Sequence, residues 1–167
     1  YDSLSISNLR IIENLKSGDI WSEISITSDT GQLDYQFLNH LKYTNDSLHV
    51  SFEEDGLTLN GKQWSVIPGN ELLISDSAII SKDFIFTEGN QKIAFYNTDQ
   101  VGSIVAEQLK LQNLLAIFKS PQHEGIVKGN LNLEFTMPYK KQFEGIGVDL
   151  SINDLYVFDS LIGNITF

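Results

Sequence analysis

The chain has 167 residues, of which 41% are hydrophobic and 20% charged, a composition typical of one globular domain and not of a disordered segment. Its 22 acidic and 11 basic residues give a net charge of −11, which disfavours nucleic acid and anionic membrane surfaces as partners. It contains no cysteine, which excludes disulfides, thiolate metal sites and cysteine nucleophiles. No apolar stretch reaches the ~18 residues that a membrane-spanning helix requires.

Alternating apolar and polar residues run through the first half of the chain. This period of two predicts antiparallel strands with one apolar and one polar face. The apolar positions are Ile24, Ile26, Leu33, Tyr35, Phe37, Leu48, Val50, Phe52, Leu57 and Leu59, followed by Phe84 and Phe86. Turn sequences separate these runs, among them Asn45-Asp46-Ser47, Glu54-Asp55-Gly56, Pro68-Gly69-Asn70 and Glu88-Gly89-Asn90. The pair Asn60-Gly61 predicts a two-residue hairpin, because both residues tolerate a positive φ.

Residues 103–119 depart from this pattern. Here Leu111, Leu114, Leu115 and Phe118 follow the i, i+3, i+4, i+7 spacing of one helix face. Ser103 is a candidate N-cap with Glu107 in the first turn. We therefore expect one short amphipathic helix near 103–119 that covers one end of a sheet.

The period of two resumes after the expected helix. Apolar residues occupy Val127, Leu131, Leu133, Phe135 and Met137, and then Ile146, Val148, Leu150 and Ile152. The apolar phase changes near Asn153-Asp154, where Leu155 and Val157 take over, and this change predicts a β-bulge.

These patterns together predict an all-β antiparallel meander in a single domain spanning residues 1–167. A sheet with one apolar face must hide that face, either by curling into an elongated groove (a β-taco) or by packing as a sandwich. Periodicity is the same in both cases, so both remain open. The chain begins without Met and ends within a strand pattern, and we expect it to be an excised segment of a longer repetitive β protein.

No catalytic or metal-binding motif is found in the sequence. His40, His49 and His123 are far apart, and there is no nucleophile elbow, phosphate-binding loop or dinucleotide fingerprint. The acidic residues Glu53-Glu54-Asp55, and Asp149 with Asp154, are expected to be solvated, although a carboxylate pair converging in a cleft would favour a hydrolase. We expect a non-enzymatic chain without cofactor or metal.

The two tryptophans keep a second function class open. Trp21 and Trp64 could stack on sugar rings or fill the core. The alternative hypothesis is therefore a β-sandwich module of a cell-surface protein that binds a carbohydrate or a protein.

The order of the strand motifs resembles one known family. The motifs are Leu33-Asp34-Tyr35-Gln36-Phe37, Leu48-His49-Val50-Ser51-Phe52, Trp64-Ser65-Val66-Ile67, Gly125-Ile126-Val127-Lys128-Gly129-Asn130-Leu131-Asn132-Leu133 and Leu161-Ile162-Gly163-Asn164. From residue 33 to the end, this series is similar to an internal segment of the TamB-type translocation and assembly module proteins, of the AsmA-like group, in the version found in Bacteroidetes.

The resemblance implies a non-enzymatic part of an inner-membrane-anchored protein that crosses the periplasm as a curled sheet. Such proteins are implicated in phospholipid transport and in outer-membrane protein assembly. The implied partners are lipid acyl chains, an outer-membrane assembly protein and the remainder of the same chain. The implied groove lining is Val127, Leu131, Leu133, Phe135, Met137, Ile146, Val148, Leu150 and Ile152.

Overall fold

The computed structural model describes residues 8–16, 18–28, 30–76, 78–97, 101–115, 127–138 and 145–167. In these residues the chain forms a 13-stranded antiparallel sheet and one short helix, which confirms the predicted fold class. The strands of the first half are β1 (Asn8–Lys16), β2 (Asp19–Thr27), β3 (Leu33–Thr44), β4 (Ser47–Leu59), β5 (Lys62–Val66), β6 (Glu71–Ser75) and β7 (Ile79–Lys82). The second half contains β8 (Ile85–Glu88), β9 (Gln91–Asn97), β10 (Val101–Lys110), α1 (Leu111–Leu115), β11 (Val127–Pro138), β12 (Gly147–Val157) and β13 (Ser160–Thr166).

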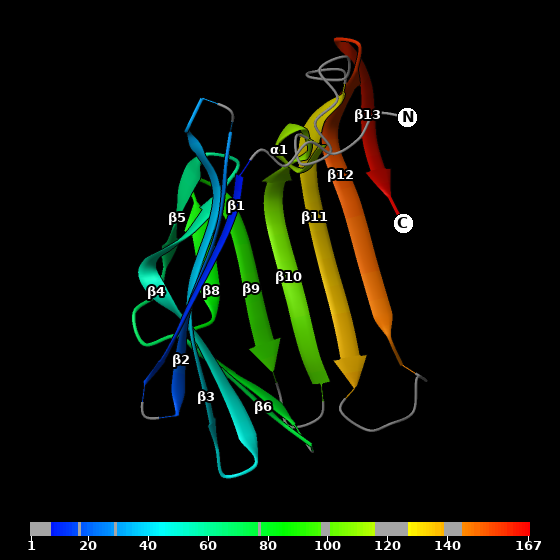
Figure 1. The fold of residues 1–167 in the computed structure, drawn as a ribbon. Helices are drawn as coiled ribbons and strands as arrows, with labels where there is room; N and C mark the ends of the chain where they lie inside the picture. The colour runs from blue at the N-terminus through cyan, green and yellow to red at the C-terminus, as the bar shows by residue number, and fades with distance from the viewer. Residues whose placement is uncertain are drawn as a thin grey trace, which may run out of the picture.

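The sheet is a meander with one side branch. Its main path runs β1-β2-β3-β4-β5-β8-β9-β10-β11-β12-β13, while β6 pairs with β4 and β7. Figure 1 shows that the sheet bends, with β1–β4 seen nearly edge-on and β9–β12 seen as a broad surface. The two parts meet at the short strand β5, which pairs with β4 on one side and with β8 on the other. In the described part of the chain β1 and β13 pair with one neighbour each, so the sheet does not close into a barrel.

The predicted hairpin at Asn60-Gly61 is confirmed. Leu59 pairs with Lys62, and the two turn residues have φ angles of 52° and 70°. Asn45 and Asp46 form a similar turn between β3 and β4, with φ angles of 50° and 55°. Two positive φ values characterise the turns that match the right-handed twist of a hairpin.

The predicted turn at Glu54-Asp55-Gly56 is wrong, because β4 continues through it. Phe37 pairs with Leu57 and Asn39 with Phe52, so residues 53–56 bulge out opposite Leu38. Gly56 allows this close approach, since a Cβ atom there would lie 2.6 Å from the Leu38 carbonyl oxygen. The apolar residues on either side of the bulge therefore belong to one strand.

The helix predicted near 103–119 begins at Leu111, and residues 103–110 belong to β10. The physical reason is a β-bulge in β10. Ala106 pairs with Leu133 and Leu109 pairs with Leu131, so β10 advances by three residues where β11 advances by two. Gln108 takes a positive φ of 54° at this point. Ser103 is a strand residue and not an N-cap, while Phe118 lies outside the described residues.

The bulge predicted at Asn153-Asp154 is confirmed. The register between β12 and β13 shifts between Ile152 and Leu155, and Asp154 has a φ of 50°. The shift brings Leu155, 8% exposed, to the face on which Ile152 lies. The change of apolar phase therefore keeps one face of β12 apolar along its length.

Candidate binding face

One face of the sheet is apolar across the whole main path. Residues that are directly opposite in neighbouring strands share a face, so the pairing can be followed from strand to strand. From β1 to β5, the residues paired in this way are Ile11, Ile24, Phe37, Leu57 and Trp64. Val66 lies two residues after Trp64 in β5 and therefore on the same face. From β5 to the end of the chain, the paired residues are Val66, Phe86, Ile93, Ala106, Leu133, Leu150 and Phe167. We call this surface the apolar face and the other side of the sheet the outer face.

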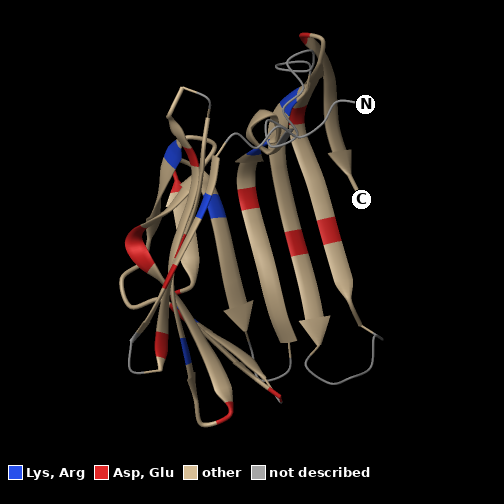
Figure 2. Cartoon of the chain, viewed as in Figure 1, with Lys and Arg blue, Asp and Glu red and all other residues tan. Residues whose placement is uncertain are grey.

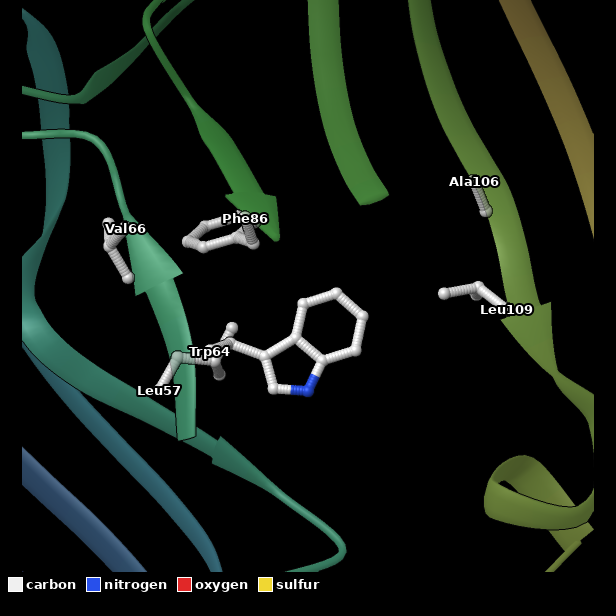
Figure 3. Close-up of a cluster of buried hydrophobic side chains, with 6 residues drawn as sticks. All are labelled: Leu57, Trp64, Val66, Phe86, Ala106 and Leu109. Carbon is white, nitrogen blue, oxygen red and sulfur yellow. The ribbon is translucent and has the colours of Figure 1, made fainter. Parts of the chain in front are cut away.

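The middle of the apolar face forms the core. Its buried cluster consists of Leu57, Trp64, Val66, Phe86, Ala106 and Leu109. Figure 3 shows Trp64 of β5 and Leu109 of β10 pointing toward one another across the bend of the sheet. The bend therefore brings distant strands together and covers the centre of the face.

Aromatic rings extend this core on one side. Phe52 packs edge-on against Phe84 and Phe86, with ring centroids 5.8 and 5.2 Å apart, and Phe84 and Phe86 are 5.0 Å apart. Edge-to-face contacts at these distances are favourable. This trio fixes the position of β8 against β4.

The margins of the apolar face are exposed. Trp64 is 4% exposed in the middle, whereas Ile11 at one margin is 57% exposed and Val148 at the other is 56% exposed. Leu9, Ile104 and Phe167 are also exposed large apolar side chains. The face is thus covered at its centre and open to solvent toward both ends of the strand order.

The structure brings the sequence-predicted lining residues together on this face. Leu131 pairs with Ile152, Leu133 with Leu150, and Phe135 with Val148, so the two strands present one apolar surface. Val127 pairs with Val157, Met137 pairs with Gly102, and Ile146 directly precedes β12. Leu131 and Leu133 pack against the core, while Met137, Ile146 and Val148 are exposed. That these residues line a lipid site stays a prediction.

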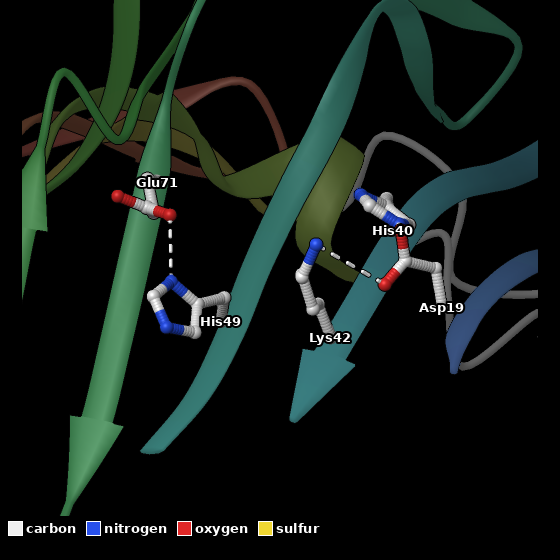
Figure 4. Close-up of polar contacts among 5 residues, drawn as sticks. All are labelled: Asp19, His40, Lys42, His49 and Glu71. Atoms are coloured by element: carbon white, nitrogen blue, oxygen red, sulfur yellow. Dashed lines mark hydrogen bonds and ion pairs between the residues drawn. The ribbon is translucent and has the colours of Figure 1, made fainter. Parts of the chain in front are cut away.

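The outer face carries polar contacts (Figure 4). Asp19 lies 3.4 Å from His40 and 3.5 Å from Lys42, and His49 Nδ1 is 2.8 Å from a carboxylate oxygen of Glu71. These pairs tie β2 to β3 and β4 to β6. Both described histidines therefore have structural partners, and His123 lies outside the described residues.

Within the described ranges, no three His, Asp or Glu side chains are grouped so that they could hold a metal ion.

The acidic residues do not gather into one centre in the described ranges. Figure 2 shows single acidic positions on β10, β11 and β12 in an otherwise mostly uncharged part of the sheet. Glu134 and Asp149 are directly opposite one another, and Glu107 is paired with Lys92 at 3.0 Å. Asp149 lies in the regular part of β12, whereas Asp154 lies within the β12 bulge.

Two buried polar side chains were missed by sequence reasoning. Asn70 and Gln91 are 2% and 3% exposed. Asn70 makes hydrogen bonds to Phe52 and Ile67, and Gln91 donates to Glu88 and accepts from the Lys110 backbone N–H at 2.9 Å. Their partners lie up to 19 residues away, so no local pattern could have revealed them.

Two further observations bear on what the chain is. Within the residues that the structure describes, no helix has the length and apolar character needed to cross a bilayer. Comparison with protein-family models, curated proteins and solved structures finds no match to the chain.

Proposed function

We propose that this chain binds lipid acyl chains on its apolar face, as a non-enzymatic segment of a periplasm-spanning protein of the TamB type. In this proposal it carries phospholipid toward the outer membrane or assists the assembly of outer-membrane proteins. The observation that carries the proposal is the continuity of the apolar face from Ile11 to Phe167, with exposed side chains at both margins.

Exposed apolar area of this extent favours a hydrophobic ligand. A folded chain normally exposes apolar side chains singly, and contiguous apolar patches mark interaction sites. Ile104, Phe135 and Val148 occupy one row across three neighbouring strands, and Ile104 and Val148 are exposed. The row crosses successive strands about 4.8 Å apart, a shape that suits an extended hydrocarbon chain.

The energy available from such contact is substantial. Transfer of a methylene group from water to an apolar environment contributes about 0.8 kcal/mol, so burial of six methylenes contributes about 5 kcal/mol. Binding of an acyl chain along this row requires no charged side chain. This agrees with the scarcity of basic residues on β10, β11 and β12. The location in the periplasm and the assembly partner follow from the family resemblance alone.

Lipid extraction and mass spectrometry of the purified chain test the proposal. We expect phospholipid to co-purify, and Val148→Asp to reduce its amount several-fold, because a carboxylate on the apolar face must be desolvated when a chain binds. Val148 is exposed, so this substitution leaves the core cluster untouched.

Leu161→Asp is the matched control. Leu161 is 60% exposed, close to the value for Val148, but it pairs with Tyr156 on the outer face. It should retain the lipid of the unmodified chain. If the unmodified chain carries no lipid, or if both variants lose it equally, acyl-chain binding on the apolar face is disproved.

A further inference from the structure

A small hollow lies on the outer face, on the other side of the sheet from the proposed lipid site. The hollow has a volume of about 200 Å³ and is open to solvent, and its lining includes Ile12, Asn14, Trp21, Glu23, Leu38 and Glu53.

Cross-strand pairing places five of its residues on the outer face, because Asn14 pairs with Trp21, and Ile12 and Leu38 both pair with Glu23. Glu53 reaches it from the bulge of β4.

Trp21 is an exposed aromatic side chain that lines this hollow. Its indole is 43% exposed and stacks on the imidazole of His40, with ring centroids 4.3 Å apart and an angle of 18° between the planes. Asp19 lies 3.4 Å from His40 and holds that ring in place (Figure 4). His40 does not line the hollow, so the hollow borders a part of the indole that His40 leaves uncovered.

The other groups around the indole are hydrogen-bonding side chains over an apolar floor. Ile12 and Leu38 supply the floor, Glu23 and Glu53 supply carboxylate acceptors, and Asn14 supplies an amide that both donates and accepts. A pyranose ring has an apolar face of C–H groups and a rim of hydroxyl groups, which matches an exposed aromatic ring bordered by such side chains.

We propose that this hollow binds one pyranose unit of a neutral or amino sugar, with the ring stacked on Trp21. The two carboxylates and the net charge of −11 disfavour anionic sugars. A quaternary ammonium ligand fits less well, because such cations are held in cages of several aromatic rings and Trp21 is the one aromatic side chain among the residues that line the hollow. The site is independent of the lipid proposal, since it lies on the opposite face.

Saturation-transfer NMR on the full chain tests the proposal with methyl glucoside, glucosamine and glucuronate as separate probes. We expect transfer to the ring C–H protons of the first two sugars and little transfer to glucuronate. Trp21→Ala should weaken binding by about tenfold or more. Trp21 is exposed, so circular dichroism should show a folded variant.

Tyr43→Ala is the matched control, because Tyr43 is an aromatic residue of β3 that is 68% exposed and does not line the hollow. It should bind sugar as the unmodified chain does. Absence of transfer to both sugars, equal loss in the two variants, or a response to choline alone would each overturn the proposal. None of these outcomes depends on whether lipid co-purifies.

Discussion

Asn70 pairs with Phe52 through its side chain as a neighbouring strand would pair through its backbone. The Phe52 N–H donates to Asn70 Oδ1 at 2.9 Å, and Asn70 Nδ2 donates to the Phe52 carbonyl oxygen at 2.8 Å. On this side β4 pairs with β6 at residues 47–50 and with β5 at residues 57–59, so Asn70 satisfies the backbone in the gap. A third hydrogen bond runs to the Ile67 carbonyl oxygen at 3.0 Å.

Asn70→Ala should therefore destabilise the fold strongly. The substitution removes three hydrogen bonds at a site only 2% exposed and leaves the Phe52 backbone groups without these partners. We expect a loss of about 3 kcal/mol in the free energy of unfolding, measured by urea denaturation. Asn14→Ala, at an exposed position, is the control and should change stability little. Equal stability of the two variants would contradict this role for Asn70.

Lys92 provides a prediction about alkaline pH. Its Nζ lies 3.0 Å from a carboxylate oxygen of Glu107 and 5.6 Å from the ring centroid of Tyr96. The hydrogen bond to Glu107, followed by that to Tyr96, raises the pKa of Lys92 above its ordinary value of 10.5. Because the folded-state pKa is the higher one, the pair adds stability below pH 10.5 and loses it as the pH rises through the folded-state value.

NMR titration of the Lys92 side chain checks this direction. We expect its pKa to lie above the ordinary value of 10.5, and Glu107→Gln to bring it back toward that value. The effect on global stability should be small, because both side chains of the ion pair are partly exposed to water. A Lys92 pKa that does not respond to Glu107→Gln would show that the hydrogen bond is not its cause.

The bulge in β10 leads to a third prediction. Gln108 has a positive φ of 54°, a conformation that glycine adopts without strain. Gln108→Gly should raise the free energy of unfolding by about 0.5–1 kcal/mol, and the backbone hydrogen bond from residue 108 to Asn132 Oδ1 should remain. Ser103→Gly, at a β10 position without a positive φ, should lower stability instead. Destabilisation by both substitutions would exclude strain at Gln108.

The same bulge explains why the helix was predicted too long. Ala106 and Leu109 are three residues apart, and the extra residue between them turns both toward the core. In the sequence, apolar residues three positions apart are typical of a helix. A bulged strand and a helix can therefore show the same pattern of apolar residues. By contrast, β11 and β12 could be predicted from alternation, because burial of one face requires a period of two.

The candidate face was predictable in its composition but not in its exposure. Alternation assigns Leu133 and Val148 to apolar faces equally well, yet Leu133 packs on the core and Val148 is 56% exposed. The difference depends on the bend at β5, which brings Trp64 over the centre of the face and leaves the margins open. A bend of this kind arises from long-range packing, which local periodicity does not record.

The last prediction distinguishes the two faces of the sheet directly by fluorescence quenching. Ile104→Trp places an indole on the apolar face, where Ile104 is 43% exposed, and Tyr156→Trp places one on the outer face, where Tyr156 is 36% exposed. Phosphatidylcholine with brominated acyl chains should quench the first variant more than the second, after subtraction of the signal of the unmodified chain. The physical reason is that bromine quenches an indole only at close range, so the acyl chain must lie on the side that carries the introduced ring. Equal quenching of both variants would mean that lipid associates with the chain without preference for the apolar face.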